Sequence, residues 1–147
     1  MEKALIFLPE ITLFLGAIFC LVLDLLGKEE EYMFAIAIGA LVVALEGVIA
    51  EVSILPLYSG TILGGGFLFY GIALFVKGVC ITGMMLISLI SGKYMRGREY
   101  EGEYYVFLLL STMALCFLAS AYDLILLYVS VEFLSIASYL LAGYLKE

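Results

Sequence analysis

The sequence contains no histidine. The side chain that usually carries protons near neutral pH, and that most often binds metal ions, is therefore absent. Any proton chemistry in this chain must use carboxylates, lysines or water. Charged residues are also scarce, since they make up 14% of the chain, whereas soluble domains contain about a quarter. No basic cluster is present that would bind nucleic acid.

Cysteine is rare as well. The three cysteines, Cys20, Cys80 and Cys116, each lie inside an apolar run. They are too far apart in the sequence to form a metal-binding motif, and free cysteine commonly behaves as a small buried hydrophobe. The cysteines therefore predict no metal site in this chain.

Long apolar runs dominate what is present. The chain has 147 residues, of which 65% are hydrophobic, and a mean hydropathy of +1.19. A bilayer core requires about 20 apolar residues per helix, and a lipid-exposed backbone must satisfy its hydrogen bonds internally. We therefore predict an all-α membrane protein with a single transmembrane region. The predicted helices cover residues 4–26, 32–50, 67–91, 104–121 and 124–145.

Two segments need a separate interpretation. Residues 51–66 contain Pro56 and the triplet Gly64–Gly66, which predict an ordered loop or hairpin. The first apolar run could be mistaken for a signal peptide. It is too long for one, however, and is interrupted by Pro9 and Glu10, so we interpret it as a retained first helix.

The loop charges predict the orientation in the membrane. With five spans, one side of the membrane carries five basic residues and the other side carries only Lys3. The five are Lys28, Lys93, Arg96, Arg98 and Lys146. The positive-inside rule places the basic side in the cytoplasm. The N-terminus is therefore expected outside and the C-terminus in the cytoplasm.

Six ionisable residues lie within or near the predicted spans, and such residues are costly at bilayer depth. They are Glu10, Asp24, Glu46, Lys77, Asp123 and Glu132. Asp24 and Asp123 lie at helix ends and can reach water, and Glu46 is close enough to an end to be interfacial. Glu10, beside Pro9, can bond to freed backbone groups or to a neighbouring helix. Lys77 lies deeper, about ten residues into its predicted helix, and is a possible charge partner for a buried acid.

Glu132 is the strongest functional candidate. It follows Leu124 by eight residues, which places it about 12 Å into the fifth helix at 1.5 Å per residue. Tyr128, Ser135 and Tyr139 share its helical face. This polar stripe must face protein or water rather than lipid. Serines that only join helices would explain Ser135 but not a carboxylate at this depth, so we predict that Glu132 relays protons.

Several stretches resemble subunit N of the proton-pumping NADH-quinone oxidoreductases. The most specific are the segments 102–105, 118–124 and 131–144, which are similar to its fourth and fifth helices. Leu8-Pro9-Glu10-Ile11 with Leu23-Asp24 resembles its first helix, and Phe75-Val76-Lys77 resembles a Phe-x-Lys in its third. Membrane-bound hydrogenases and cation/proton antiporters have closely related subunits.

The resemblance implies a multi-pass subunit of the inner or plasma membrane that moves protons without a redox cofactor of its own. Quinone, NADH, flavin and iron–sulfur clusters would belong to partner subunits. A family glutamate on the fifth helix, matched by Glu132, would pair with a lysine on a later helix. The expected partners are lipid and other membrane subunits, including the helices that carry this lysine.

The chain also departs from the family pattern. Family members have many more helices, and an acidic residue often found just before the third helix is Tyr70 here. We therefore expect either one part of a split subunit or a fragment of a longer one. The alternatives to a respiratory module are an antiporter or hydrogenase-linked module, and a purely structural or assembly subunit.

Overall fold

The computed structural model describes residues 6–27, 31–54, 60–62, 65–98 and 100–144. Within these ranges, five helices are each long and apolar enough to cross a membrane. They confirm the predicted all-α membrane fold. The helices are α2 (Leu8–Leu25), α3 (Glu31–Ile54), α4 (Gly71–Met95), α5 (Glu101–Ala119) and α6 (Leu124–Tyr144). Two short strands, β1 (Gly60–Ile62) and β2 (Phe67–Phe69), precede α4.

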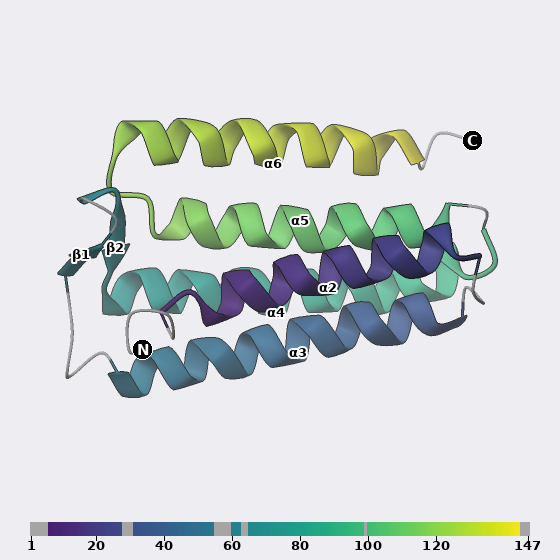
Figure 1. Cartoon of the computed structure of the whole chain (residues 1–147), viewed down its shortest axis with the longest axis horizontal. Helices are drawn as coiled ribbons and strands as arrows, with labels where there is room; N and C mark the ends of the chain where they lie inside the picture. Colours follow the sequence, from purple (N-terminus) through teal and green to yellow (C-terminus); the bar gives the residue numbers. More distant parts are fainter. Residues whose placement is uncertain (1–5, 28–30, 55–59, 63–64, 99, 145–147) are drawn as a thin grey trace.

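Four of the helices form a bundle, and the fifth lies beside it (Figure 1). The α2 helix packs on α3 and α5, and α4 packs on the same two helices from the other side. The α6 helix packs mainly on α5. This arrangement buries 56% of the α5 span but only 11% of the α6 span. Most of α6 is therefore exposed on the described chain.

The loop or hairpin expected for residues 51–66 is a hairpin, but its second strand lies beyond that segment, at residues 67–69. β1 and β2 pair antiparallel, with Gly60 opposite Phe69. A bridge joins Phe67 to Ala121, and the amide of Tyr122 donates a hydrogen bond to the Gly66 carbonyl at 2.9 Å. The hairpin is thus attached to the turn between α5 and α6. It lies at the end of the bundle where α2 and α4 begin and α3 ends, which we call the hairpin end (Figure 1).

Several predicted helix boundaries were wrong. The third predicted helix was expected from residue 67, but residues 67–69 form β2 and α4 begins at Gly71. The α3 helix continues to Ile54, so Glu51 is helical and does not lie in a loop. The α5 helix begins at Glu101 rather than at residue 104. Apolar strand residues cannot be separated from an apolar helix by hydropathy alone, which explains the first error.

Two glycines end helices at the opposite end of the bundle. Gly27 follows α2 with φ 61°, and Gly97 follows α4 with φ 76°. This left-handed conformation suits glycine because it has no Cβ. Lys93 lies on α4 and Arg96 and Arg98 follow it, so these described cations gather at this end. Lys3, Lys28 and Lys146 lie outside the described residues, and the predicted membrane orientation stays a prediction.

One glycine permits the close approach of α2 and α3. A Cβ placed on Gly16 would lie 2.6 Å from the Cβ of Ala40. Small residues at such crossings let helix backbones come together in membranes. Leu13 and Ala17, on the same helix, and Leu41, beside Ala40, are all buried. The helix crossing at Gly16 is therefore part of the bundle core.

Replacing Gly16 by Val is expected to separate α2 from α3 and to lower stability by about 1–3 kcal/mol, as overpacking usually does. The measurement is thermal unfolding of the detergent-solubilised protein in its native assembly. Gly39→Val, on α3, is the matched control, because nothing lies within 4 Å of a Cβ at that position. Equal losses in both variants would mean that the close approach contributes nothing.

Candidate functional site

Lys77 is completely buried and lies between two carboxylates from different helices. Its Nζ is 2.6 Å from Oε1 of Glu10 on α2 and 3.5 Å from Oε2 of Glu51 on α3. The exposed fractions of the Lys77, Glu10 and Glu51 side chains are 0%, 3% and 0%. The Phe67 ring of β2 covers the ammonium group, with 5.0 Å between Nζ and the ring centroid. We call Glu10, Lys77 and Glu51 the triad.

The helix register explains why the triad forms. Glu10 is near the start of α2, Glu51 is near the end of α3, and both ends lie at the hairpin end of the bundle. Lys77 follows Gly71 by six residues, which corresponds to about 9 Å along α4. The lysine is therefore shallower than predicted, because α4 begins later than the sequence suggested. At this position along the bundle, the Lys77 side chain reaches the carboxylates of both Glu10 and Glu51.

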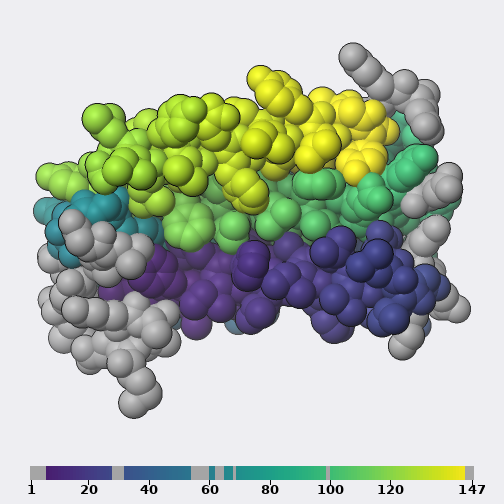
Figure 2. Space-filling model, turned by 45° about the horizontal axis from the view of Figure 1, so that its top comes forward, coloured from purple at the N-terminus to yellow at the C-terminus, as the bar shows by residue number. Residues whose placement is uncertain are grey.

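Glu132 lies in a different environment. It is exposed on α6, and the α6 residues buried against the bundle are Ser130 and Ala137. Tyr128 is 65% exposed and Tyr139 is 76% exposed. These residues lie on the face of α6 that points away from α5. In the part of the chain that the structure describes, no element covers this stripe. Figure 2 shows α6 along one edge of the molecule, with α5 visible between α6 and α2.

The serines of α6 satisfy their own hydrogen bonds. The hydroxyl groups of Ser130, Ser135 and Ser138 each donate to the carbonyl four residues earlier, at 2.7–2.8 Å. Such bonds within one helix leave no donor that must point to a neighbour. The carboxylate of Glu132 has no such internal partner among the described residues. It is therefore the polar group of this face that most needs a partner.

The structure does not bring the two principal predicted residues together. Lys77 is buried among α2, α3 and β2, whereas Glu132 is exposed on α6, which packs mainly on α5. Among the described residues, the ion-pair partners of Lys77 are Glu10 and Glu51. Lys77 therefore serves as a charge partner, but for two acids that the sequence pattern did not assign to it.

The signals for these two acids in the sequence are weak. Pro9 leaves backbone groups without hydrogen bonds, so Glu10 could as readily bond to them as to a neighbouring helix. The glycines after Glu51 suggest that Glu51 lies in a loop. Glu51 is nevertheless the only charged residue of the stretch 51–66, which could have marked it as a helix residue with a buried partner. No sequence spacing could show that both acids meet Lys77.

The remaining candidate acids, Asp24, Glu46 and Asp123, lie outside the triad. Asp24 is partly buried, and its carboxylate lies so close to Gly102 that no Cβ would fit there. This position is in the first turn of α5, where the helix dipole favours a negative charge. The Tyr144 hydroxyl donates a hydrogen bond to Glu103 in the same turn. Asp123 is exposed just before α6, as expected for an interfacial group. Glu46 is also exposed, but α3 continues to Ile54, so Glu46 lies eight residues from the helix end and deeper than predicted.

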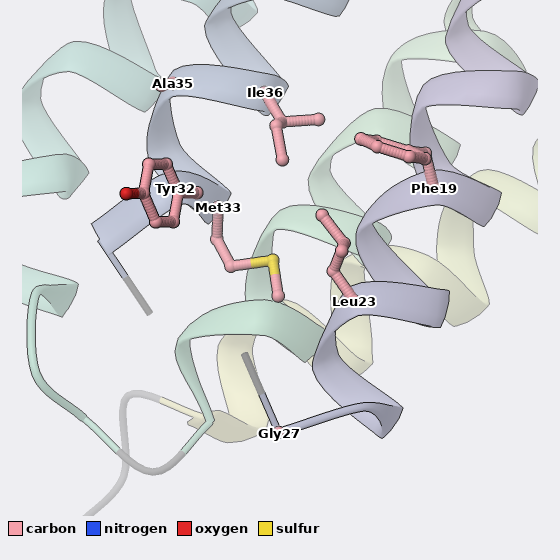
Figure 3. Close-up of a pocket in the computed structure, with 7 residues that line it drawn as sticks. All are labelled: Phe19, Leu23, Gly27, Tyr32, Met33, Ala35 and Ile36. Atoms are coloured by element: carbon pink, nitrogen blue, oxygen red, sulfur yellow. The ribbon is translucent and has the colours of Figure 1, made fainter. Parts of the chain in front are cut away.

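The surface grooves of the bundle are largely apolar. A groove of about 650 Å³ lies between α2 and α3, and Figure 3 shows Phe19 and Leu23 facing Met33 and Ile36 across it. Among the described residues, no carboxylate or lysine lines this groove. A second groove, of about 670 Å³, lies between α2 and α5, and Glu10 is the charged residue among its described lining. Within the described chain, the triad and the Glu132 stripe are therefore better candidate sites than these two grooves.

Comparison with known proteins found relatives over nearly the whole chain. No family model matches the sequence. The chain is 36% identical over 149 residues to NADH-quinone oxidoreductase subunit N 1 of Solibacter usitatus, a match that covers 99% of this chain and 30% of the relative. It is 34% identical over 145 residues to NADH-quinone oxidoreductase subunit N of Bacillus anthracis, covering 95% of this chain and 28% of the relative.

A cyanobacterial protein gives a similar result. The chain is 33% identical over 142 residues to NAD(P)H-quinone oxidoreductase subunit 2 of Synechococcus sp., covering 95% of this chain and 26% of the relative. The chain thus spans less than a third of the length of these curated relatives. The matched part includes the triad and the Glu132 stripe, since nearly all of this chain is covered.

Proposed function

Because this chain belongs to the family of NADH-quinone oxidoreductase subunit N and corresponds to part of that subunit, we propose that it is a proton-translocating membrane module of a respiratory NADH:quinone oxidoreductase. Quinone reduction elsewhere in the complex would drive proton movement through Glu132. The complex would lie in the inner or plasma membrane. NADH, quinone, flavin and iron–sulfur clusters would be bound by partner subunits.

The observation that supports this proposal best is the position of Glu132. A carboxylate about 12 Å from the end of its helix is expensive in lipid, yet the described bundle leaves it exposed. The stripe therefore needs a polar partner from outside the described chain. In the proposed module, that partner is a lysine on a further helix. A carboxylate with a movable lysine partner can alternate between charged and protonated states, as a proton relay requires.

Two other functions remain as alternatives. An antiporter or a hydrogenase-linked pump could use the same module, because their membrane subunits are closely related to the subunit that this chain resembles. A structural or assembly subunit could present the same helices without moving protons. An antiporter or hydrogenase-linked pump would differ from the proposed module in its partner subunits and in the ion that it moves. In a structural subunit, Glu132 would be replaceable.

Deleting the gene for this chain is expected to abolish NADH-dependent proton uptake in inverted membrane vesicles and to lower NADH:quinone reductase activity strongly. Electron transfer from NADH to a hydrophilic artificial acceptor should persist if the electron-input subunits still assemble, since no redox group is assigned to this chain. Complementation with the intact gene is the control, and it should restore both activities.

Purification through a tag on this chain distinguishes the alternatives. Co-purification of NADH-oxidising and quinone-binding subunits supports the proposal. Co-purification of a nickel–iron subunit, or sodium-dependent proton exchange with no change in NADH oxidation, would support the alternative machines. Unchanged coupled activity in the deletion strain would refute the proposed role.

A further inference from the structure

The triad contains one more acid than base within a membrane-spanning bundle. With both carboxylates ionised, Glu10, Lys77 and Glu51 would carry a net charge of −1 at sites that are at most 3% exposed. An unpaired buried charge costs several kcal/mol even after relaxation of its surroundings. Groups in such sites neutralise themselves rather than remain charged. One excess negative charge is removed most simply by one bound proton.

The distances indicate which acid holds the proton. Glu10 approaches the lysine Nζ to 2.6 Å, whereas the nearest oxygen of Glu51 is 3.5 Å away. Both contacts are ion pairs, but the longer one gives Glu51 the weaker electrostatic stabilisation of a negative charge. Glu51 is also the more deeply buried of the two acids, with an exposed fraction of 0% against 3%.

The hydrogen bonds around the triad are incomplete. Among the described residues, the four carboxylate oxygens and Nζ have no hydrogen bond of good geometry, although the ion-pair distances are short. Buried polar groups are normally satisfied. A carboxylic acid at Glu51 adds a donor to a cluster in which the lysine is otherwise the sole donor, so a proton there also improves the balance of donors and acceptors.

Among the residues that the structure describes, the groups around the triad add no compensating positive charge. Cys80 of α4 and Cys116 of α5 are free thiols and carry no positive charge. Phe67 of β2 contributes an aromatic face towards Lys77. Glu46, on the same helix as Glu51, is exposed away from the bundle core. Lys77 is therefore the cation that faces the two acids within the described chain.

We propose that the triad is a second proton-binding site, which holds one exchangeable proton on Glu51 while Glu10 remains ionised against Lys77. The proton moves between the Glu51 carboxyl group and water at the hairpin end, and no other bond changes. Glu10 also lines the largely apolar groove between α2 and α5, so one member of the triad borders the surface of the bundle. This proposal does not depend on proton movement through Glu132.

Infrared difference spectroscopy of the purified native membrane assembly tests the proposal. The carbonyl stretch of a protonated carboxylic acid is absent from an ionised carboxylate, so it counts bound protons. The signal assigned to the triad should disappear in Glu51→Gln. It should also disappear in Glu10→Gln, because Glu51 then becomes the ionised partner of Lys77. It should double in Lys77→Met, where both acids must be neutral. Transfer to heavy water should shift the band if the proton exchanges.

Asp123→Asn is the matched control, because this acid is exposed at the start of α6 and its replacement should leave the triad signal unchanged. If Lys77→Met does not assemble, the two Gln variants still decide, since each leaves a neutral triad. Spectra of Glu51→Gln and Glu10→Gln identical to that of the wild type would overturn the proposal, as would a band that never shifts in heavy water. The measurement needs no turnover, so its failure is separate from failure of the proposed pumping function.

Discussion

Replacing Glu132 by Gln is expected to reduce proton pumping and the coupled quinone-reductase rate several-fold or more. Gln keeps the size and hydrogen-bonding capacity of the side chain but cannot titrate. A group that is locked in one charge state cannot pass protons on. Glu132→Asp keeps the acid on a shorter side chain, so its effect should be milder. The measurements are proton uptake and NADH:quinone reduction in inverted vesicles that contain the assembled complex.

Two controls separate the relay from a structural effect. Asp123→Asn removes an exposed carboxyl group at the start of the same helix and should leave pumping close to the wild-type rate. Electron transfer from NADH to an artificial acceptor upstream of quinone should be unaffected in Glu132→Gln. Normal pumping by a fully assembled Glu132→Gln complex would assign this residue a structural role and would favour the scaffold alternative.

Replacing Lys77 by Met should destabilise the chain more than Gly16→Val does. It removes the cation 2.6 Å from Glu10 in a site with almost no solvent exposure. Glu10 must then take up a proton, at a cost in free energy, because an unpaired charge cannot be kept there. Removing one member of a buried ion pair typically costs about 3–5 kcal/mol. We expect a large fall in the amount of chain in the membrane and in the thermal stability of its assembly, measured by quantitative immunoblotting and by unfolding in detergent.

A second substitution should reverse this loss. Glu10→Gln in the Lys77→Met background removes the acid that lost its cation and must otherwise be protonated, so membrane levels should recover towards those of the wild type. Lys93→Met is the matched control, because this lysine lies exposed near the end of the same helix and should cost little. A stable Lys77→Met single variant, or a double variant no better than the single one, would argue against a charged pair between Glu10 and Lys77.

The helices could be predicted because lipid permits few alternatives. Apolar runs of about 20 residues must form helices when their backbone has no water to bond, and all five predicted helices exist. The errors fell at the ends, where this constraint is weaker. Residues 67–69 are as apolar as the helix that follows, so only pairing with residues 60–62 showed that they form a strand. The family relationship also followed from the sequence, because its motifs are local.

Glu132 and its stripe could be predicted because they lie on one helix, where spacing alone places residues on a common face. The packing of the helices decides which surroundings this stripe faces. In the described bundle the stripe is exposed. The triad is also tertiary. Its members are separated by 41 and 26 residues along the chain, and no local pattern encodes which helix ends meet. Hydropathy and spacing are enough to show that ionisable groups enter the membrane. The packing of α2, α3 and α4, in contrast, decides that Lys77 pairs with Glu10 and Glu51 inside the bundle. The packing of α6 on α5 decides that Glu132 is exposed on the described chain.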